Sequence, residues 1–203
     1  MPPCATDLAV LAPVRSAIEL RAGGSNALAT SFPQLVRSAV DFVIDPVHTA
    51  RTSIAELGTF ERTILSRKIE HFILDLFDAP KRVRDLVIGG TAVEVKSTTT
   101  VSWKMSRETY AKGGVCLLSR IDTARSRCSL GLIVAQIESL GSPDRYGTRS
   151  VTKLGRSKIL WLLESVPFLE SLVSLDSSDP SDQPLDAIRT RRDFPSCPNP
   201  QSA

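Results

Sequence analysis

The segment Asp85–Lys96 restricts the fold of this chain more than any other. Two alternating apolar runs flank Gly89-Gly90, and a glycine pair between such runs is typical of a two-residue hairpin turn, which needs positive φ angles. Counting back from this turn along both strands places Asp85 directly opposite Glu94. Because side chains alternate between the two faces of a strand, Asp85, Glu94 and Lys96 share one face and the apolar residues share the other.

Two opposed carboxylates in a hairpin repel each other unless something neutralises them. A divalent cation would remove this repulsion, and Mg²⁺ is typically held by one or two carboxylates together with water and phosphate oxygens. The structural alternative is a solvated charged face on which Lys96 pairs with Glu94. The pattern by itself leaves both interpretations open.

Composition predicts one globular domain. The chain has 203 residues with 42% hydrophobic and 23% charged residues, which is enough to build a proper core. We expect an N-terminal segment of uncertain structure over 1–30, a folded domain over 31–175 and a disordered tail over 176–203. The four cysteines show no C-x-x-C spacing, which argues against a disulfide framework or a zinc site.

The sequence also predicts a protein that does not enter a membrane. It contains no apolar stretch of about eighteen residues and no convincing signal peptide. We therefore expect a cytoplasmic protein.

Several helices are expected before the hairpin. Residues 8–21 have a helical pattern, and a second helix is predicted to begin at 31–33 and to end before Pro46. A longer helix should run from Thr49 or Thr52 to Phe77, because Pro80 cannot continue it.

After the hairpin we expect two strands and a last helix. Residues 115–121 and 128–137 have the apolar composition of buried strands. Residues 141–150 are interpreted as a loop, and a final helix is predicted over 153–163.

The helix that ends near Phe77 contains an anomalous acid. Glu61 and Lys68 fall in the middle of an apolar arc made of Leu57, Ile64, Leu65, Phe72 and Leu76. A buried carboxylate must be paired or ligated, and Lys68 is badly placed as its partner because it lies two turns away, about 10.5 Å along the axis. Glu61 is therefore a candidate metal ligand. Glu70 lies on the polar face and is interpreted as a solvated acid, although the sequence does not decide which of the two completes a site.

Basic residues are concentrated in 96–127 and again in 145–158. Such segments suit a polyanion, because lysine and arginine contacts to phosphates supply most of the non-specific affinity for DNA. Lys104, Arg107, Lys112 and the aromatic Trp103 are the candidate DNA contacts. The alternatives are a solvated charged surface for the bases and a core position for Trp103.

The pattern of Asp85, Glu94, Val95 and Lys96 resembles the PD-(D/E)xK nuclease motif. An ordered set of further short matches resembles the endonuclease domain of NaeI-type type II restriction enzymes over about residues 50–165. These matches are 57–61, 89–96, 103–105, 114–118, 129–133, 154–156 and 159–162. The element Gly58–Glu61 also resembles MutH-like nicking enzymes. The chain departs from the pattern at Val95, where a polar residue or cysteine is often found.

The resemblance implies a restriction-endonuclease-like α/β (α+β) core with a mixed β-sheet flanked by helices. It implies Mg²⁺-dependent hydrolysis of double-stranded DNA at a specific sequence, a homodimer and a cognate DNA methyltransferase in the same system. Asp85, Glu94, Glu61 and the carbonyl of Val95 would bind the metal, and Lys96 would be the catalytic lysine. Two alternatives are a repair or recombination nuclease of the same fold, with MutH-like nicking, and a DNA-binding module without catalysis.

Overall fold

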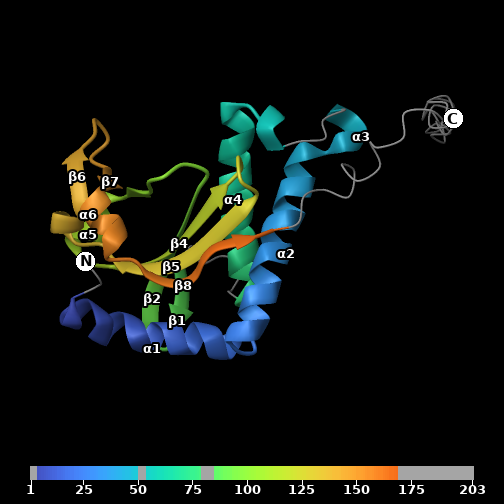
Figure 1. Cartoon of the computed structure of the whole chain (residues 1–203). Coiled ribbons are helices and arrows are strands. Elements are labelled where there is room, and N and C mark those ends of the chain that lie inside the picture. Colours follow the sequence, from blue (N-terminus) through green and yellow to red (C-terminus); the bar gives the residue numbers. More distant parts are fainter. Residues whose placement is uncertain (1–3, 50–53, 79–84, 169–203) are drawn as a thin grey trace, which may run out of the picture.

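A five-stranded sheet lies at the centre of the molecule in a computed structural model that describes residues 4–49, 54–78 and 85–168 (Figure 1). The strands lie in the order β1-β2-β4-β5-β8. Their bounds are β1 Asp85–Ile88, β2 Thr91–Thr98, β4 Val115–Asp122, β5 Arg127–Val134 and β8 Leu160–Pro167. β2 and β4 run parallel and the other pairs are antiparallel. The predicted mixed sheet is therefore confirmed.

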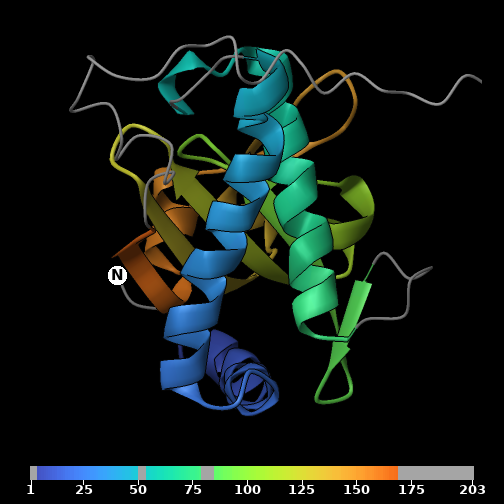
Figure 2. The same cartoon turned by 90° about the vertical axis from the view of Figure 1, so that its right-hand side faces the viewer.

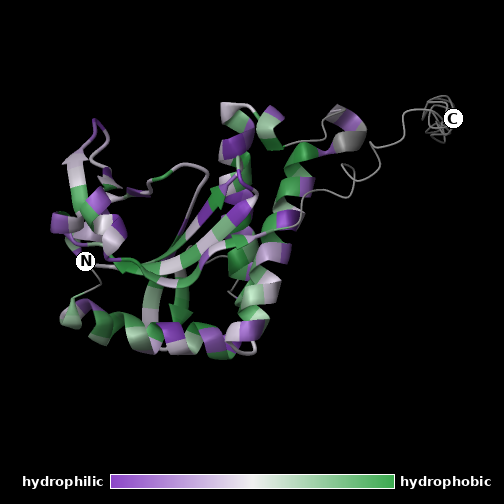
Figure 3. Cartoon of the chain, in the orientation of Figure 1, coloured by the Kyte–Doolittle hydropathy of each residue, from purple (hydrophilic) through white to green (hydrophobic). Residues whose placement is uncertain are grey.

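The β1–β2 hairpin has the predicted register. Gly89 and Gly90 have φ angles of 57° and 78°, as a two-residue turn of this kind requires. Asp85 is the Cα partner of Glu94. The apolar face of the hairpin is buried, and it comprises Leu86, Ile88, Val93 and Val95. In Figure 3, β1 is coloured as hydrophobic over most of its length.

Three long helices bury the larger core against the sheet. They are α1 (Ala5–Arg21), α2 (Ser25–Ile44) and α4 (Thr59–Leu76), with the short segments α3 (Pro46–Thr49) and η1 (Ile54–Glu56) between α2 and α4. Figure 2 shows α2 and α4 side by side, with α1 crossing below them. None of the helices in the described part of the chain has the length and apolar character needed to span a membrane.

A smaller layer covers the other face of the sheet. It contains the three-stranded sheet β3-β7-β6, two short α-helices and one 3-10 helix. Their bounds are β3 Lys104–Met105, α5 Arg107–Ala111, η2 Ile137–Ser139, β6 Leu140–Pro143, β7 Arg149–Val151 and α6 Lys153–Ser157. Alternate residues of β4 supply the two cores: Leu117 and Ile121 face the large helices, whereas Cys116 and Leu118 belong to the second core. This double burial explains why β4 and β5 are apolar along their whole length.

The helix predicted to begin at 31–33 begins at Ser25 instead, and Pro33 lies inside it. An internal proline costs a helix about 3 kcal/mol. Leu28 and Phe32 are almost completely buried on the core face of α2, so packing of this face outweighs the proline. The helix predicted to start at Thr49 or Thr52 begins at Thr59; residues 50–53 lie outside the described residues.

The prediction of a helix over 153–163 is wrong in its second half. α6 ends at Ser157, and Leu160–Pro167 forms β8 beside β5. A short apolar run has no period that separates a buried helix from a buried strand, and here the free edge of β5 decides. The loop predicted over 141–150 contains part of β6 and of β7. The tail predicted over 176–203 lies outside the described residues.

Gly155 provides a test of the packing between α6 and η2. A Cβ at this position would overlap the Ser139 carbonyl oxygen and lie 2.9 Å from Val151 Cγ1. We expect Gly155→Ala to lower the free energy of unfolding by about 1–3 kcal/mol, as overpacking usually does. In the control Gly141→Ala, the nearest neighbour of the new Cβ lies at an ordinary 3.6 Å, so its stability should change little. Urea denaturation measures the free energy of unfolding of both variants. If Gly155→Ala were as stable as the control Gly141→Ala, the close packing described for Gly155 would be contradicted.

Candidate active site

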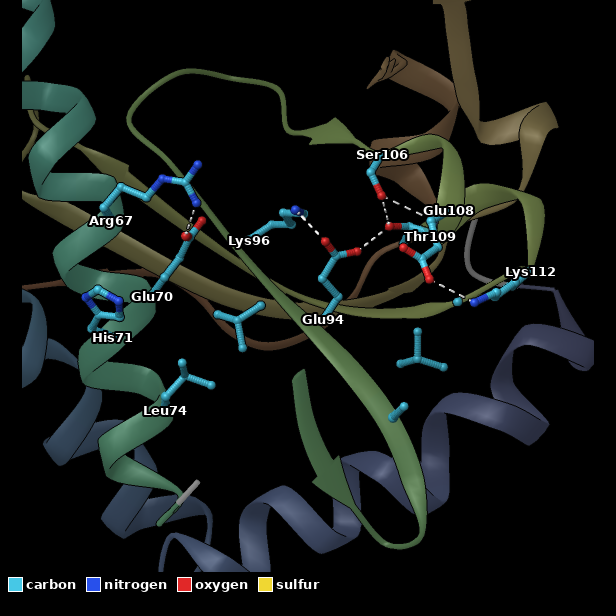
Figure 4. A pocket seen from close by; sticks show the side chains of 14 residues that line it. Arg67, Glu70, His71, Leu74, Glu94, Lys96, Ser106, Glu108, Thr109 and Lys112 are labelled. Carbon is cyan, nitrogen blue, oxygen red and sulfur yellow. Dashed lines mark hydrogen bonds and ion pairs between the residues drawn. The ribbon is translucent and has the colours of Figure 1, made fainter. Parts of the chain in front are cut away.

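A pocket of about 790 Å³ opens where β2 passes between α4 and α5 (Figure 4). β2 contributes Glu94 and Lys96, which lie at the centre of the view. Glu70 approaches from α4 on one side, and Thr109 from α5 on the other. The polar face predicted for the hairpin is therefore one wall of a pocket, and acids and bases from three elements converge there.

Glu94 and Lys96 form the central ion pair of the pocket. Lys96 Nζ lies 2.5 Å from Glu94 Oε1, and each side chain is 24% exposed. The two residues share a face because they are two positions apart on β2. This is the Lys–Glu contact that the structural alternative predicted, and it also leaves both groups accessible from the pocket.

Thr109 holds the second oxygen of Glu94. Its hydroxyl donates a hydrogen bond to Glu94 Oε2, and its own position is fixed by Ser106, the N-cap of α5, whose Oγ accepts from the Thr109 amide at 3.3 Å. Sequence reasoning missed Thr109. A serine before a short helix predicts the cap, but no local pattern tells which strand the capped helix will contact.

Glu70 was interpreted as a solvated acid, and this interpretation is wrong. Its side chain is only 17% exposed. Oε1 accepts from the Ser97 amide at 3.0 Å, and Oε2 accepts from Arg67 at 3.0 Å. The carboxylate is therefore anchored to the backbone directly after Lys96, inside the pocket.

Glu61 lies at the start of α4 and is not among the residues that line the pocket. Its Oε2 accepts from the Gly58 amide at 2.8 Å, which is one half of a capping box; glycine has no side chain to supply the other half. The buried residues of α4 are Leu65, Ile69 and Ile73. Leu65 of the predicted arc is buried, but Ile64 is 37% exposed, so the buried face of the helix is rotated away from Glu61 toward Ile69 and Ile73.

The other predicted metal ligands lie on the hairpin. Asp85 is opposite Glu94 in the register, although its side chain is outside the described part. Val95 follows Glu94 on β2, and its side chain is buried against the core. Among the side chains that the structure describes, no three of His, Cys, Asp or Glu gather closely enough to hold a metal ion. The oxygens of Glu94 and Glu70 are nevertheless the donor type that Mg²⁺ prefers, so the donor chemistry of the pocket fits this ion.

Of the predicted lysine and arginine contacts to DNA, Lys112 lies in the pocket lining, whereas Lys104 and Arg107 lie outside it. Lys112 lines the pocket, and its hydrogen bond to Glu108 at 2.9 Å lowers the pKa of that carboxyl. Arg107 is exposed on α5, and Lys104 is 69% exposed and pairs with Asp144.

Trp103 does not fit the prediction of a DNA contact. It is 2% exposed, and its indole nitrogen donates to the Ser119 carbonyl at 2.8 Å. Its ring lies 6.4 Å from that of Trp161. Trp103 is a core residue, as the alternative interpretation proposed.

Most of the chain matches a family of known proteins. The model of the family described as "Restriction endonuclease NaeI" matches residues 25–183, which is most of the chain and includes every residue of the pocket. The mixed sheet flanked by helices agrees with the restriction-endonuclease-like core that the sequence predicted. No curated protein matches the chain.

The role of Glu61 as a helix cap can be tested by measuring the thermal stability of two variants. Glutamine also completes a capping box, so we expect Glu61→Gln to retain the melting temperature. Glu61→Ala should lower the free energy of unfolding by about 1 kcal/mol, because the Gly58 amide loses its acceptor. Thermal denaturation of both variants measures the difference. If Glu61→Gln destabilised the protein as much as Glu61→Ala, the negative charge rather than the cap would be the essential property.

Proposed function

This chain belongs to the restriction endonuclease NaeI family and is a type II site-specific deoxyribonuclease, and on that basis we propose that it hydrolyses both strands of DNA with Mg²⁺ in the pocket between α4, β2 and α5. The observation that carries the proposal is the convergence of Glu94, Lys96 and Glu70 on one pocket. These are the carboxylates and the lysine that a metal-dependent nuclease needs.

We propose Asp85, Glu94 and the carbonyl of Val95 as metal ligands, with Glu70 in the place first expected for Glu61. Glu70 is preferred because its carboxylate is held beside Lys96, whereas the carboxylate of Glu61 caps α4. When bound, the metal would lower the pKa of a water molecule and stabilise negative charge on the phosphate.

The chain's own groups would prepare the site for this chemistry. Thr109 orients the Glu94 carboxylate, and the Ser97 amide orients that of Glu70. The ammonium of Lys96 can donate to a phosphate oxygen or to the attacking water from its place beside Glu94. Fixed donors and acceptors of this kind lower the barrier, because they need not reorganise during the reaction.

We propose that Lys104, Arg107 and Lys112 contact phosphates of the DNA. All three are exposed, and lysine and arginine contacts to phosphates carry no base information. One active site would hydrolyse one strand at a time. Cutting of both strands would therefore need two copies of the chain, and a homodimer is the simplest arrangement. A cognate methyltransferase and a cytoplasmic location would accompany this activity. The nicking alternative would leave nicked rather than linear plasmid.

The metal should stabilise the fold and be required for cleavage. Asp85 and Glu94 are register partners, and two opposed carboxylates repel without a cation. A ligand at a hundred times its Kd stabilises by about 2.7 kcal/mol, so Mg²⁺ or Ca²⁺ should raise the melting temperature. Plasmid digestion should need Mg²⁺ and stop in EDTA.

Asp85→Asn and Glu70→Gln are the informative variants. Asp85→Asn should melt no lower than the parent without metal, lose most of the metal-induced rise and cut plasmid at background rate. Glu70→Gln should also reduce the metal-induced rise, whereas Glu61→Gln should keep both the rise and the cleavage. Intact cleavage by Asp85→Asn, or its unfolding without metal, would contradict the ligand assignment.

Binding to DNA should depend on salt and survive removal of the metal. In EDTA, the logarithm of the association constant should fall linearly with the logarithm of the sodium chloride concentration. Arg107→Gln and Lys112→Gln should each lower the slope by about one unit if each contacts one phosphate. Arg21→Gln, at the exposed end of α1, removes the same charge as a control and should leave the slope unchanged. A flat salt response would rule out phosphate contacts as the source of affinity.

A further inference from the structure

The loop of residues 144–148 between β6 and β7 is held in one conformation by its own first residue. Asp144 Oδ1 accepts from the amides of Tyr146 and Thr148 at 2.9 and 3.0 Å, and Oδ2 accepts from the Thr148 hydroxyl at 2.6 Å. The Thr148 hydroxyl is the main cause that lowers the pKa of Asp144 to about 2. Asp144 is thus ionised at neutral pH and remains an acceptor for the whole loop.

The tip of this ordered loop presents two side chains to solvent. Tyr146 is 73% exposed, and the guanidinium of Arg145 lies 4.6 Å from the centre of its ring. No carboxylate among the described residues pairs with that guanidinium. Figure 1 shows the loop projecting from the body of the molecule, and Figure 3 shows its tip as hydrophilic. Packing of the core does not explain why a loop held by these hydrogen bonds exposes an aromatic ring and an arginine.

Helix α5 joins this loop to the pocket. Thr109 contacts Glu94, and the next residue, Tyr110, donates its hydroxyl to the Gly147 carbonyl at 3.0 Å. On the other side of the loop, Lys104 Nζ lies 3.2 Å from Asp144. The two ends of the loop are therefore braced by the segment that also holds Glu94.

These contacts limit how far the loop can lie from the site of hydrolysis. The Cα atoms of Thr109 and Tyr110 are neighbours in the chain, about 3.8 Å apart. With the lengths of the two side chains added, Gly147 lies within roughly 20 Å of the Glu94 carboxylate. Duplex DNA covers that span in about six base pairs, so the loop can reach bases close to a phosphate that binds in the pocket.

We propose that the loop 144–148 enters a groove of the DNA and that Arg145 and Tyr146 are specificity-determining residues that contact base edges. This inference rests on the proposed function. Arginine binds guanine O6 and N7 in a bidentate manner, and an exposed aromatic ring can contact a thymine methyl group or wedge against a base step. Two strands joined by a tight loop are narrow enough to enter the major groove. Lys104, Arg107 and Lys112 would then position the duplex while the loop selects the sequence.

The experiment measures which sequences are cut rather than only how fast. A pool of linear duplexes with a randomised central segment is digested in Mg²⁺, and the new ends are sequenced. Arg145→Gln and Tyr146→Ala are compared with the parent. Each has a control that makes the same change elsewhere: Arg21→Gln for the charge, and Phe60→Ala for an aromatic residue that is 76% exposed. All four side chains are exposed, so the melting temperatures should remain those of the parent.

We expect Arg145→Gln and Tyr146→Ala to lose selectivity at one or two positions of the consensus, or to cut the parent's site roughly 10- to 100-fold more slowly, the discrimination that one good base contact provides. Affinity for a duplex that lacks the consensus, measured in Ca²⁺, should change by less than about threefold, because phosphate contacts are retained. Both controls should keep the parent's consensus and rate.

Any one of four results would overturn the inference. If the parent cuts at a consensus and both loop variants keep that consensus and rate, the loop does not select bases. An equal loss in the controls, or an equal loss of affinity for the duplex without the consensus, would mean that the loop contributes only general binding. If the parent does not cut the pool at all, the proposed function itself fails, and this inference fails with it.

Discussion

The left-handed backbone of Gly89 and Gly90 fixes the register of the β1–β2 hairpin, and the candidate active site depends on that register. A shift by one residue would turn Glu94 and Lys96 into the core and would expose Val93 and Val95. Burial of two charges away from their solvent is costly even when they are paired. The apolar core on one face and the pocket on the other therefore enforce the same register, and one turn both shapes the sheet and orients the chemical groups.

The pocket itself is assembled by contacts between elements that are distant in the chain. Glu70 on α4 reaches the amide of Ser97, and Thr109 on α5 reaches Glu94. Each carboxylate is thus held by a donor from another element before any ligand is present. Such preorganisation is what a site for a charged phosphate needs, since the groups keep their places as charge develops. The hydrogen bond from the Ser97 amide to Glu70 requires α4 to lie beside β2, and Figure 4 shows Glu70 on the side of α4 that faces β2.

The small layer formed by α5 and the β3-β7-β6 sheet links the chemistry to the surface. Thr109 and Tyr110 are adjacent on α5, yet one contacts β2 and the other contacts the loop after β6. The buried Trp103 anchors this layer through the carbonyl of Ser119 on β4. A displacement of the layer would therefore move the support of Glu94 and the exposed loop together.

Much of this arrangement was contained in local sequence. The glycine pair, the alternation of apolar and charged residues and the apolar runs of β4 and β5 are properties of consecutive residues, and they determined the hairpin, the pairing of Asp85 with Glu94 and the central strands. The positions of Glu94 and Lys96 on one polar face followed from the same two-residue period. The apolar run of β8 was wrongly predicted as a helix, because a helix and a buried strand can both contain such a run, and only the open edge of β5 selected a strand.

Only the tertiary structure placed Glu70 in the pocket and left Glu61 outside the pocket lining. Both lie on α4, and the helical period places them on different faces, but the period does not say which face meets β2. The contacts of Thr109 and Trp103 could not be predicted for the same reason: neither a helix cap nor an aromatic residue indicates which strand it will contact. The sequence by itself determined which side chains share a face, because backbone geometry repeats over neighbouring residues. Only the packing of α4 and α5 against β2 decided which of those faces meet, because that depends on surfaces formed by residues far apart in the chain.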